Sequence, residues 1–244
     1  MYDYFLGGAH NFEADRQLGD RLLAIAPEIP ELARSNRSFL RRAVRWLCAA
    51  GIDQFIDVGS GIPTAGNVHE VARRANPASR VVYVDIEPVA VAHARLLLGD
   101  DPQTVVLRAD MREPASIMDS PEVSRLVDLR RPVALLMVSM LHFIPDDERP
   151  AELVAGYRRW LAPGSYLVVT HATANEHTTD VKEQYELTPT PIHTRSREAI
   201  AGLLAGFELV PPGLVVVHEW HPDTPPTPEE VARSAGDGGI GALT

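Results

Sequence analysis

Apolar residues follow two different spacings along this chain, and the two alternate. Short runs rich in Val, Ile and Leu are typical of strands that are covered on both faces, and they recur between segments in which apolar residues return every three or four positions, as in amphipathic helices. This alternation of strand and helix predicts an α/β fold with a parallel sheet and helices on both faces. The parallel strands are expected at 54–58, 81–84, 104–107, 133–138 and 165–170.

The two ends of the chain depart from this alternation. Residues 1–50 are expected to form helices, because Leu40, Val44 and Leu47 recur at helical spacing. Segments 208–210 and 214–218 flank Pro211-Pro212-Gly213, and we expect them to form an antiparallel hairpin at one edge of the sheet. The stretch 222–244 is rich in proline and glycine, so it is expected to be an extended or mobile tail. The sequence therefore divides into a helical cap at 1–50, an α/β domain at 51–221 and a tail at 222–244.

The most informative stretch is the turn that follows the first expected strand. That strand runs into Asp57 and then into a glycine-x-glycine turn formed by Gly59, Ser60 and Gly61, while Asp85 ends the second strand. Glycine allows a sharp turn and lets a ligand approach the backbone. An acid at the end of the second strand is well placed to accept hydrogen bonds from ribose hydroxyls. Together these features predict a nucleoside-binding site.

The details of the turn bear on which nucleoside binds. A dinucleotide site needs a third glycine where this chain has Thr64, and Pro63 removes an amide that a pyrophosphate would use. S-adenosylmethionine has no phosphate, and Asp57 suits a ligand that carries an ammonium group. The turn thus favours S-adenosylmethionine over NAD, and the remaining alternative is a strand–turn–helix that binds no ligand.

Charge and cysteine content narrow the function classes. The formal net charge of −10 disfavours general binding to nucleic acids or anionic membranes. The single cysteine, Cys48, lies on an apolar stripe, so it is expected to be a packed thiol rather than a nucleophile. With no signal peptide and no apolar run that could span a bilayer, we expect a cytoplasmic protein. We also expect a monomer or a homodimer.

One expected helix carries a run of five arginines, namely Arg34, Arg37, Arg41, Arg42 and Arg45. We interpret this run as a solvated helix face, and the alternative is an anion-binding patch.

Four segments of this chain, at residues 2–12, 55–70, 141–146 and 161–166, resemble segments of an actinobacterial family of S-adenosyl methyltransferases. The resemblance spans nearly the whole chain, and the first two segments are its specific part. It implies the class I Rossmann-like three-layer sandwich, with a seven-stranded, mostly parallel sheet and added N-terminal helices. It also implies S-adenosylmethionine as cofactor. Members of this family usually begin somewhat upstream of the motif at 2–12, so further residues or a different start are expected there.

The resemblance also implies roles for residues of the cofactor site. Asp57, Gly59 and Gly61 would lie under the methionine part, and Asp85 would hold the ribose. Asp110 would bind the adenine amino group beside Met111, although it could instead cap a helix. The N-terminal segment would be a lid over the cofactor or simply a packed helix. The full set of expected cofactor contacts is Asp57, Gly59, Ser60, Gly61, Asp85, Ile86, Asp110, Met111, Ser139, His10, Asn11 and Asn67, with Asn67 as an alternative helix cap.

The acceptor side is less specific. His142 follows the fourth strand and could be a general base or could bond a backbone carbonyl. A hydroxyl acceptor would call for such a base, whereas a carboxylate acceptor would favour Arg195 or Arg197. His171 and His193 are further candidates, and His69 with Glu70 does not make a metal site. The sequence predicts a methyltransferase that acts on oxygen or nitrogen of a small molecule. The alternatives are a regulatory S-adenosylmethionine-binding protein without catalysis and an NAD-dependent oxidoreductase.

Overall fold

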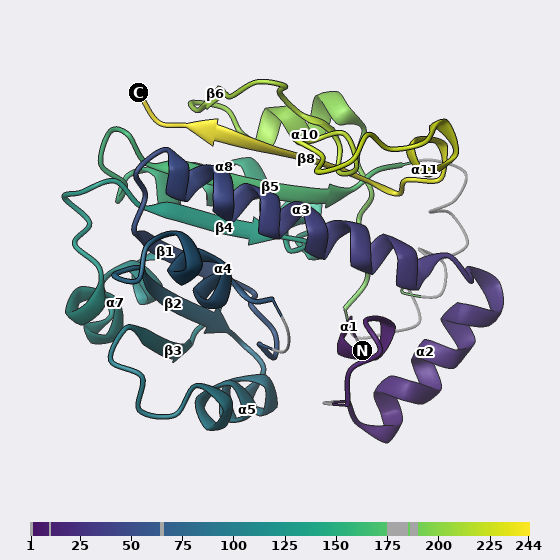
Figure 1. Cartoon of the computed structure of the whole chain (residues 1–244), viewed down its shortest axis with the longest axis horizontal. Helices are drawn as coiled ribbons and strands as arrows, with labels where there is room; N and C mark the ends of the chain where they lie inside the picture. Colours follow the sequence, from purple (N-terminus) through teal and green to yellow (C-terminus); the bar gives the residue numbers. More distant parts are fainter. Residues whose placement is uncertain (1, 10, 64–65, 175–184, 186–189) are drawn as a thin grey trace.

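A mixed β-sheet lies at the centre of the molecule (Figure 1). The computed structural model describes residues 2–9, 11–63, 66–174, 185 and 190–244. Within these residues the strands are β1 (Gln54–Val58), β2 (Arg80–Asp85), β3 (Thr104–Arg108), β4 (Ala134–Val138), β5 (Tyr166–Ala172), β6 (Glu208–Leu209), β7 (Val215–Val216) and β8 (Gly236–Ala242). The strand order is β3-β2-β1-β4-β5-β8-β6, and β7 also pairs with β8. Strands β1 to β5 are parallel, as predicted, and β8 runs antiparallel to β5.

Helices cover both faces of the sheet. One face carries α3 (Ile29–Ala49), α4 (Val68–Ala75) and α5 (Pro88–Leu98), and the other carries α6 (Pro114–Met118), α7 (Pro121–Leu126), α8 (Pro150–Arg158) and α10 (Arg197–Leu203). Because side chains alternate along a strand, Phe55 faces the first group of helices and Ile56 faces the second. The predicted three-layer sandwich is therefore confirmed. The remaining elements are α1 (Tyr2–Phe5), α2 (Glu13–Ile25), α11 (Pro228–Ala232) and the 3₁₀ turns η1 (Leu141–Phe143) and η2 (Asp146–Glu148).

The N-terminal helices form a small core of their own beside the sheet. Phe5, Leu22 and Ala33 belong to this core, whereas the later residues Phe39 and Val44 of α3 pack on the sheet. Helix α3 thus joins the two cores. Figure 1 shows α1 and α2 at the edge of the molecule toward which strands β4 and β5 run, which is the carboxyl edge of the parallel strands. The N-terminal segment therefore lies at the edge where α/β sheets bind ligands.

The arginine run on α3 is only in part the solvated face that we expected, because Arg34, Arg41 and Arg45 are exposed whereas Arg42 is buried. Arg42 is buried and donates hydrogen bonds to the carbonyls of Trp220 (2.8 Å) and Val217 (2.6 Å). Arg45 pairs with Asp223 at 2.6 Å. Several of these side chains therefore connect α3 to other segments of the protein.

Cys48 lies near the end of α3, and its Sγ is 3.9 Å from the carbonyl oxygen of Ala72. Burial raises the pKa of this thiol to about 11. A thiol that stays protonated at neutral pH is a poor nucleophile, so the prediction of a packed thiol is confirmed.

The C-terminal segment differs from the expected tail. Residues 228–232 form α11, and 236–242 form β8, which lies between β5 and β6. Antiparallel strands do occur at this side of the sheet, but β6 and β7 each pair with β8 in the described structure. The glycines that indicated a tail are used for close packing. A Cβ added at Gly238 would lie 2.8 Å from Phe39, and one at Gly241 would lie 2.6 Å from Phe207.

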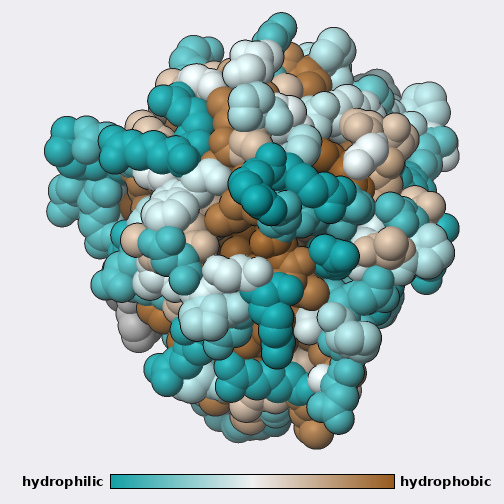
Figure 2. All heavy atoms as spheres, turned by 90° about the vertical axis from the view of Figure 1, so that its left-hand side faces the viewer, coloured by the Kyte–Doolittle hydropathy of each residue, from teal (hydrophilic) through white to brown (hydrophobic). Residues whose placement is uncertain are grey.

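The amino edge of the sheet has a hollow of its own. Figure 2 views the molecule from this side and shows apolar side chains in a central depression, surrounded by hydrophilic ones. A cavity of about 360 Å³ is lined by Arg80 and residues 124–130. Arg80 begins β2, so this hollow lies at the opposite end of the strand from Asp85.

In the described part of the chain, no helix has the length and apolar character needed to cross a membrane.

Candidate active site at the carboxyl edge of the sheet

The turn after β1 requires glycine. Gly59 and Gly61 have φ angles of +73° and +62°, a region in which other residues are strained. A Cβ at Gly59 would overlap the side chain of Met140, whereas one at Gly61 would meet nothing within 4 Å. The half-buried Ser60 donates its backbone N–H to the carbonyl of Val84 at 3.1 Å, which ties the turn to β2. The turn is thus closed by Met140 on one side and open at Gly61.

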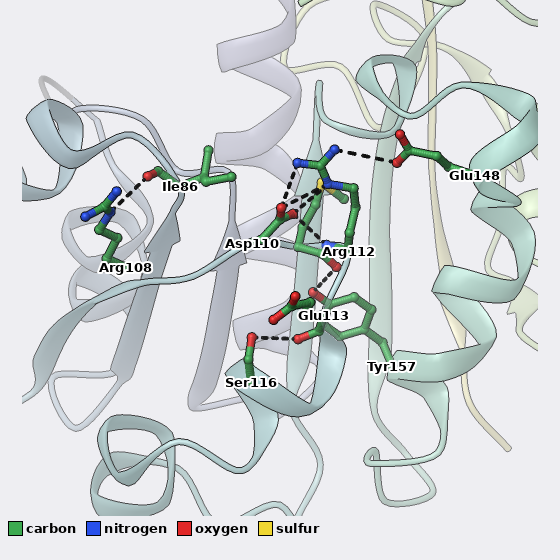
Figure 3. Close-up of polar contacts among 9 residues, drawn as sticks. Ile86, Arg108, Asp110, Arg112, Glu113, Ser116, Glu148 and Tyr157 are labelled. Atoms are coloured by element: carbon green, nitrogen blue, oxygen red, sulfur yellow. Dashed lines mark hydrogen bonds and ion pairs between the residues drawn. The ribbon is translucent and has the colours of Figure 1, made fainter.

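Asp85 is held by backbone amides at the end of β2. The N–H of Gly61 donates to Oδ2 at 2.7 Å, and the N–H of Glu87 donates to Oδ1 at 2.9 Å. A carboxylate oxygen can accept two hydrogen bonds, so each oxygen can still receive one from a ligand hydroxyl. Ile86, the next residue, has an exposed side chain, and Arg108 donates to its carbonyl at 3.3 Å (Figure 3).

Asp57 differs from Asp85 because it is almost fully buried. Burial raises the pKa of its carboxyl group to about 7, and the nearby charge of Asp85 acts in the same direction. The guanidinium of Arg37 opposes this rise. Asp57 can therefore hold a proton or a charge near neutral pH, and a cation beside it would favour the charged form.

Asp110 follows β3 and is bound by an arginine in the structure (Figure 3). Arg112 donates from Nε to Oδ1 at 2.9 Å and from Nη2 to Oδ2 at 2.7 Å, and Arg112 also lies 3.7 Å from Glu148. This pairing lowers the pKa of Asp110 below its usual value, so the carboxylate is ionised. The neighbouring Met111 is buried, and its carbonyl accepts a hydrogen bond of 2.7 Å from Tyr157.

A chain of hydrogen bonds joins the end of β4 to the N-terminus. Ser139 has a left-handed φ of +57° and donates its N–H to Oγ1 of Thr170 at 2.9 Å. Thr170 donates to Asn36 at 2.7 Å, and Asn36 donates to the hydroxyl of Tyr2 at 3.0 Å. Strained backbone of this kind gathers at functional sites. The contacts fix the loop after β4 relative to α1 and α3.

The N-terminal segment is folded around Asn11. Its amide nitrogen donates to Asp3 at 3.0 Å and to the carbonyl of Gly8 at 2.7 Å, and its amide oxygen accepts from Arg16 at 3.1 Å. Both N–H bonds of this amide are thus used within the segment. The expected contact at His10 falls outside the described residues.

Asn67 is the N-cap residue of α4, but its side chain does not cap the helix. Its side chain makes no capping hydrogen bond, so the alternative of a helix cap is wrong. Asn67 is buried, and its oxygen accepts a long hydrogen bond of 3.5 Å from Nη1 of Arg37. The side chain is therefore directed to a cation on α3.

His142 lies in η1, directly after β4, and is uncharged at neutral pH. Burial lowers the pKa of its imidazole to about 3, and the charges of His171 and Arg195 act in the same direction. Its Nδ1 is buried and has no hydrogen-bond partner among the described residues. The backbone carbonyl of His142 accepts from the N–H of His193 at 2.7 Å. The imidazole itself thus makes no side-chain hydrogen bond with the described residues.

Arg195 and His171 are instead fully engaged. Nδ1 of His171 lies 2.8 Å from the carbonyl of Ala172, which can only accept, so the proton is on Nδ1. Its Nε2 then accepts from Arg195 at 2.8 Å, and burial lowers the pKa of His171 to about 4. Arg195 also donates to the carbonyl of Ile144 at 2.8 Å and to Asp146 at 2.6 Å. These two residues brace the loop after β4.

Arg197 is paired as well. Its guanidinium donates to both carboxylate oxygens of the buried Asp237, at 2.7 and 3.0 Å. The two arginines that a carboxylate acceptor would have used are thus already neutralised by other groups.

Within the described residues, no group of three or more His, Cys, Asp or Glu side chains could hold a metal ion.

Sequence reasoning assigned no site role to several residues that meet the expected ones. Arg37 bonds Asn67, and its charge acts on the pKa of Asp57. Met140 lies against Gly59, and Thr170 bonds both Ser139 and Asn36. For Arg37 the available signal was the run of arginines on α3, for which an anion-binding patch was the alternative interpretation.

Comparisons with known proteins identify the relatives of this chain. The family model of the S-adenosyl methyltransferases matches residues 1–244. A structure of a Thermobifida fusca protein is 42% identical, with a TM-score of 0.94 over 100% of this chain and 93% of that one. A DUF574 family protein from Streptomyces avermitilis is 37% identical, with a TM-score of 0.94 over 100% and 95%. No curated protein matches the chain.

A more distant structure has the same fold. The magnesium protoporphyrin IX methyltransferase of Synechocystis, solved with bound S-adenosylhomocysteine, is 14% identical, with a TM-score of 0.59 over 100% of this chain and 92% of that one. At this identity the likeness is one of fold. It agrees with the predicted class I methyltransferase fold.

Proposed function

Because the chain belongs to the S-adenosyl methyltransferase family, we propose that it methylates an uncharged hydroxyl or amine of a small molecule. The family makes it an S-adenosylmethionine-dependent methyltransferase and sets aside the NAD-dependent alternative. The observation that carries the acceptor proposal is His142, an uncharged imidazole at the carboxyl edge whose buried Nδ1 has no partner among the described residues. A small molecule is favoured over a nucleic acid by the net charge of −10.

The residues at the carboxyl edge fit this cofactor. Asp85 has free acceptor positions for the two ribose hydroxyls, and the open space at Gly61 lets a ligand lie against the backbone. Asp57 suits the ammonium group, and Asp110 suits the adenine amino group, provided that Arg112 shares one oxygen. When bound, the cofactor supplies a methyl group on a sulfonium, which is an electrophile. The remaining contacts that we propose are Gly59, Ser60, Ile86, Met111, Ser139 and Asn67.

His142 would orient the acceptor rather than take up its proton early. An imidazole with a pKa of about 3 is a weak proton acceptor, but it accepts a hydrogen bond from an O–H or N–H group. Such a bond would direct a lone pair of the acceptor atom toward the methyl group. Positioning of this kind supplies about 7–11 kcal/mol in well-aligned reactions. A carboxylate acceptor offers no such proton, and Arg195 and Arg197 are already paired.

An acceptor panel tests this proposal. The purified protein is incubated with S-adenosylmethionine and with phenols, alcohols, amines or carboxylic acids, and the release of S-adenosylhomocysteine is measured. We expect turnover of hydroxyl or amine compounds and none of carboxylic acids. His142→Ala should lower kcat on the order of 10- to 100-fold while the affinity for S-adenosylhomocysteine stays unchanged, as expected from the loss of a positioning contact.

A matched control is His221→Ala, which removes an exposed histidine that contacts the carbonyl of Pro211. This variant should keep wild-type activity. The proposal fails if carboxylic acids are the substrates that turn over, or if His142→Ala is as active as the wild type on the preferred acceptor.

A further inference from the structure

Arg37 on α3 carries a guanidinium whose hydrogen-bonding capacity is mostly unused. A guanidinium has five N–H donors. In the described part of the chain, Arg37 makes one long hydrogen bond, from Nη1 to Asn67 at 3.5 Å, and its buried Nε has no partner. Its Cζ also lies 5.8 Å from the ring centroid of Tyr2. Buried donors without partners are costly, so an acceptor is expected at this place.

The position of this guanidinium is next to the glycine turn. Its partner Asn67 directly precedes α4, the helix that follows the turn. The charge of Arg37 acts on Asp57 and lowers the pKa of that carboxyl group. Yet Arg37 forms no ion pair with any carboxylate of the described residues. A cation without an ion pair among the described residues therefore acts electrostatically on a buried acid at the glycine turn.

An α-amino acid carries the complementary pair of charges, a carboxylate and an ammonium. We propose that Arg37 binds the α-carboxylate of the amino-acid end of the cofactor, while Asp57 pairs with its ammonium group. This inference rests on the cofactor role given above to the glycine turn. The planar guanidinium can hold both oxygens of a carboxylate, which a lysine cannot do.

A purely structural role would have a different consequence. Arg37 also stacks on Tyr2, which lies in α1, so its loss could loosen the N-terminal segment. Loosening of that kind would weaken the binding of every nucleoside that lies under the N-terminal segment. Loss of a carboxylate contact would weaken only ligands that have the amino-acid end.

Two ligands separate these effects. Isothermal titration calorimetry of the full chain is carried out with S-adenosylhomocysteine and with 5′-methylthioadenosine, which has the nucleoside but no amino-acid end. We expect Arg37→Gln to lower the affinity for S-adenosylhomocysteine roughly 10- to 100-fold and to change the affinity for methylthioadenosine by less than about threefold. Arg37→Lys should give a smaller loss for S-adenosylhomocysteine. Arg34→Gln, which alters an exposed arginine one turn earlier on α3, is the matched control and should leave both ligands unchanged.

The outcomes are distinguishable. Equal binding of S-adenosylhomocysteine by wild type and Arg37→Gln would overturn this inference and leave the cofactor site standing. An equal loss of affinity for both ligands in Arg37→Gln would overturn it in favour of the structural role. Failure of the wild type to bind S-adenosylhomocysteine at all would overturn both the inference and the proposed cofactor site.

Discussion

The two acids at the ends of β1 and β2 perform different tasks because their surroundings differ. Asp85 is partly exposed and fixed by two backbone amides, which leaves it as a ready acceptor for hydroxyl groups. Asp57 is buried, and its pKa of about 7 makes its charge depend on pH and on what binds beside it. One acid is therefore suited to recognise a ribose and the other to recognise a cation.

Asp57 predicts a pH dependence of ligand binding. Its carboxyl group is protonated below pH 7 and ionised above, and only the ionised form attracts the ligand ammonium. Arg37 favours the ionised form and Asp85 disfavours it. The affinity for S-adenosylhomocysteine should therefore fall as the pH drops from about 7.5 to 5.5, by up to about tenfold per unit. Calorimetry across this range measures the effect, and Asp57→Asn should bind weakly with no such dependence. A wild-type affinity that is constant over this range would contradict the role given to Asp57.

Asp85 predicts a large loss of affinity on substitution. Hydrogen bonds to a charged group contribute about 1.5–3 kcal/mol each, and two ribose hydroxyls are involved. Asp85→Ala should therefore weaken S-adenosylhomocysteine roughly 100-fold or more, as measured by calorimetry. Glu87→Ala is the control, because Glu87 meets Asp85 through its backbone N–H, which the substitution keeps. A loss below about threefold in Asp85→Ala would mean that the ribose is held elsewhere.

At the scale of the elements, the sequence predicted the strands that bury apolar side chains on both faces. Strands β1 to β5 were found because their short apolar runs alternate with segments of helical spacing. Strand β8 was missed because its sequence, GDGGIGA, resembles a flexible tail. The need for glycine there comes from Phe39 and Phe207, which are distant in the sequence, so no local pattern could reveal it.

Gly238 tests the place of β8 in the sheet. An added methyl group would lie 2.8 Å from Phe39 and 3.0 Å from Thr170, so Gly238→Ala should destabilise the protein by about 1–3 kcal/mol. Gly202→Ala is the control, because Gly202 lies in α10 with open space around it, and alanine favours helices by about 1 kcal/mol. Urea unfolding measures both variants. A Gly238→Ala protein as stable as the wild type would show that β8 does not pack against α3.

At the scale of the whole molecule, the site is formed by segments that meet only after folding. The acids at the strand ends were predictable, since the carboxyl ends of parallel strands share one edge of a sheet. The groups that surround them were not, because Arg37, Asn36 and Thr170 come from α3 and β5. The sequence therefore indicated the acids of the site and the candidate His142, whereas the proposed contact of Arg37 with the amino-acid end depends on tertiary packing.

The central claim is that one ligand spans the carboxyl edge from Asp110 to Arg37, and a crystal structure of the complex with S-adenosylhomocysteine tests it most directly. The account predicts ribose hydroxyls within about 3.2 Å of Asp85, the adenine amino group at Asp110 and the carboxylate at Arg37. A nucleoside bound away from Asp85, for example in the hollow lined by Arg80 at the amino edge, would contradict it.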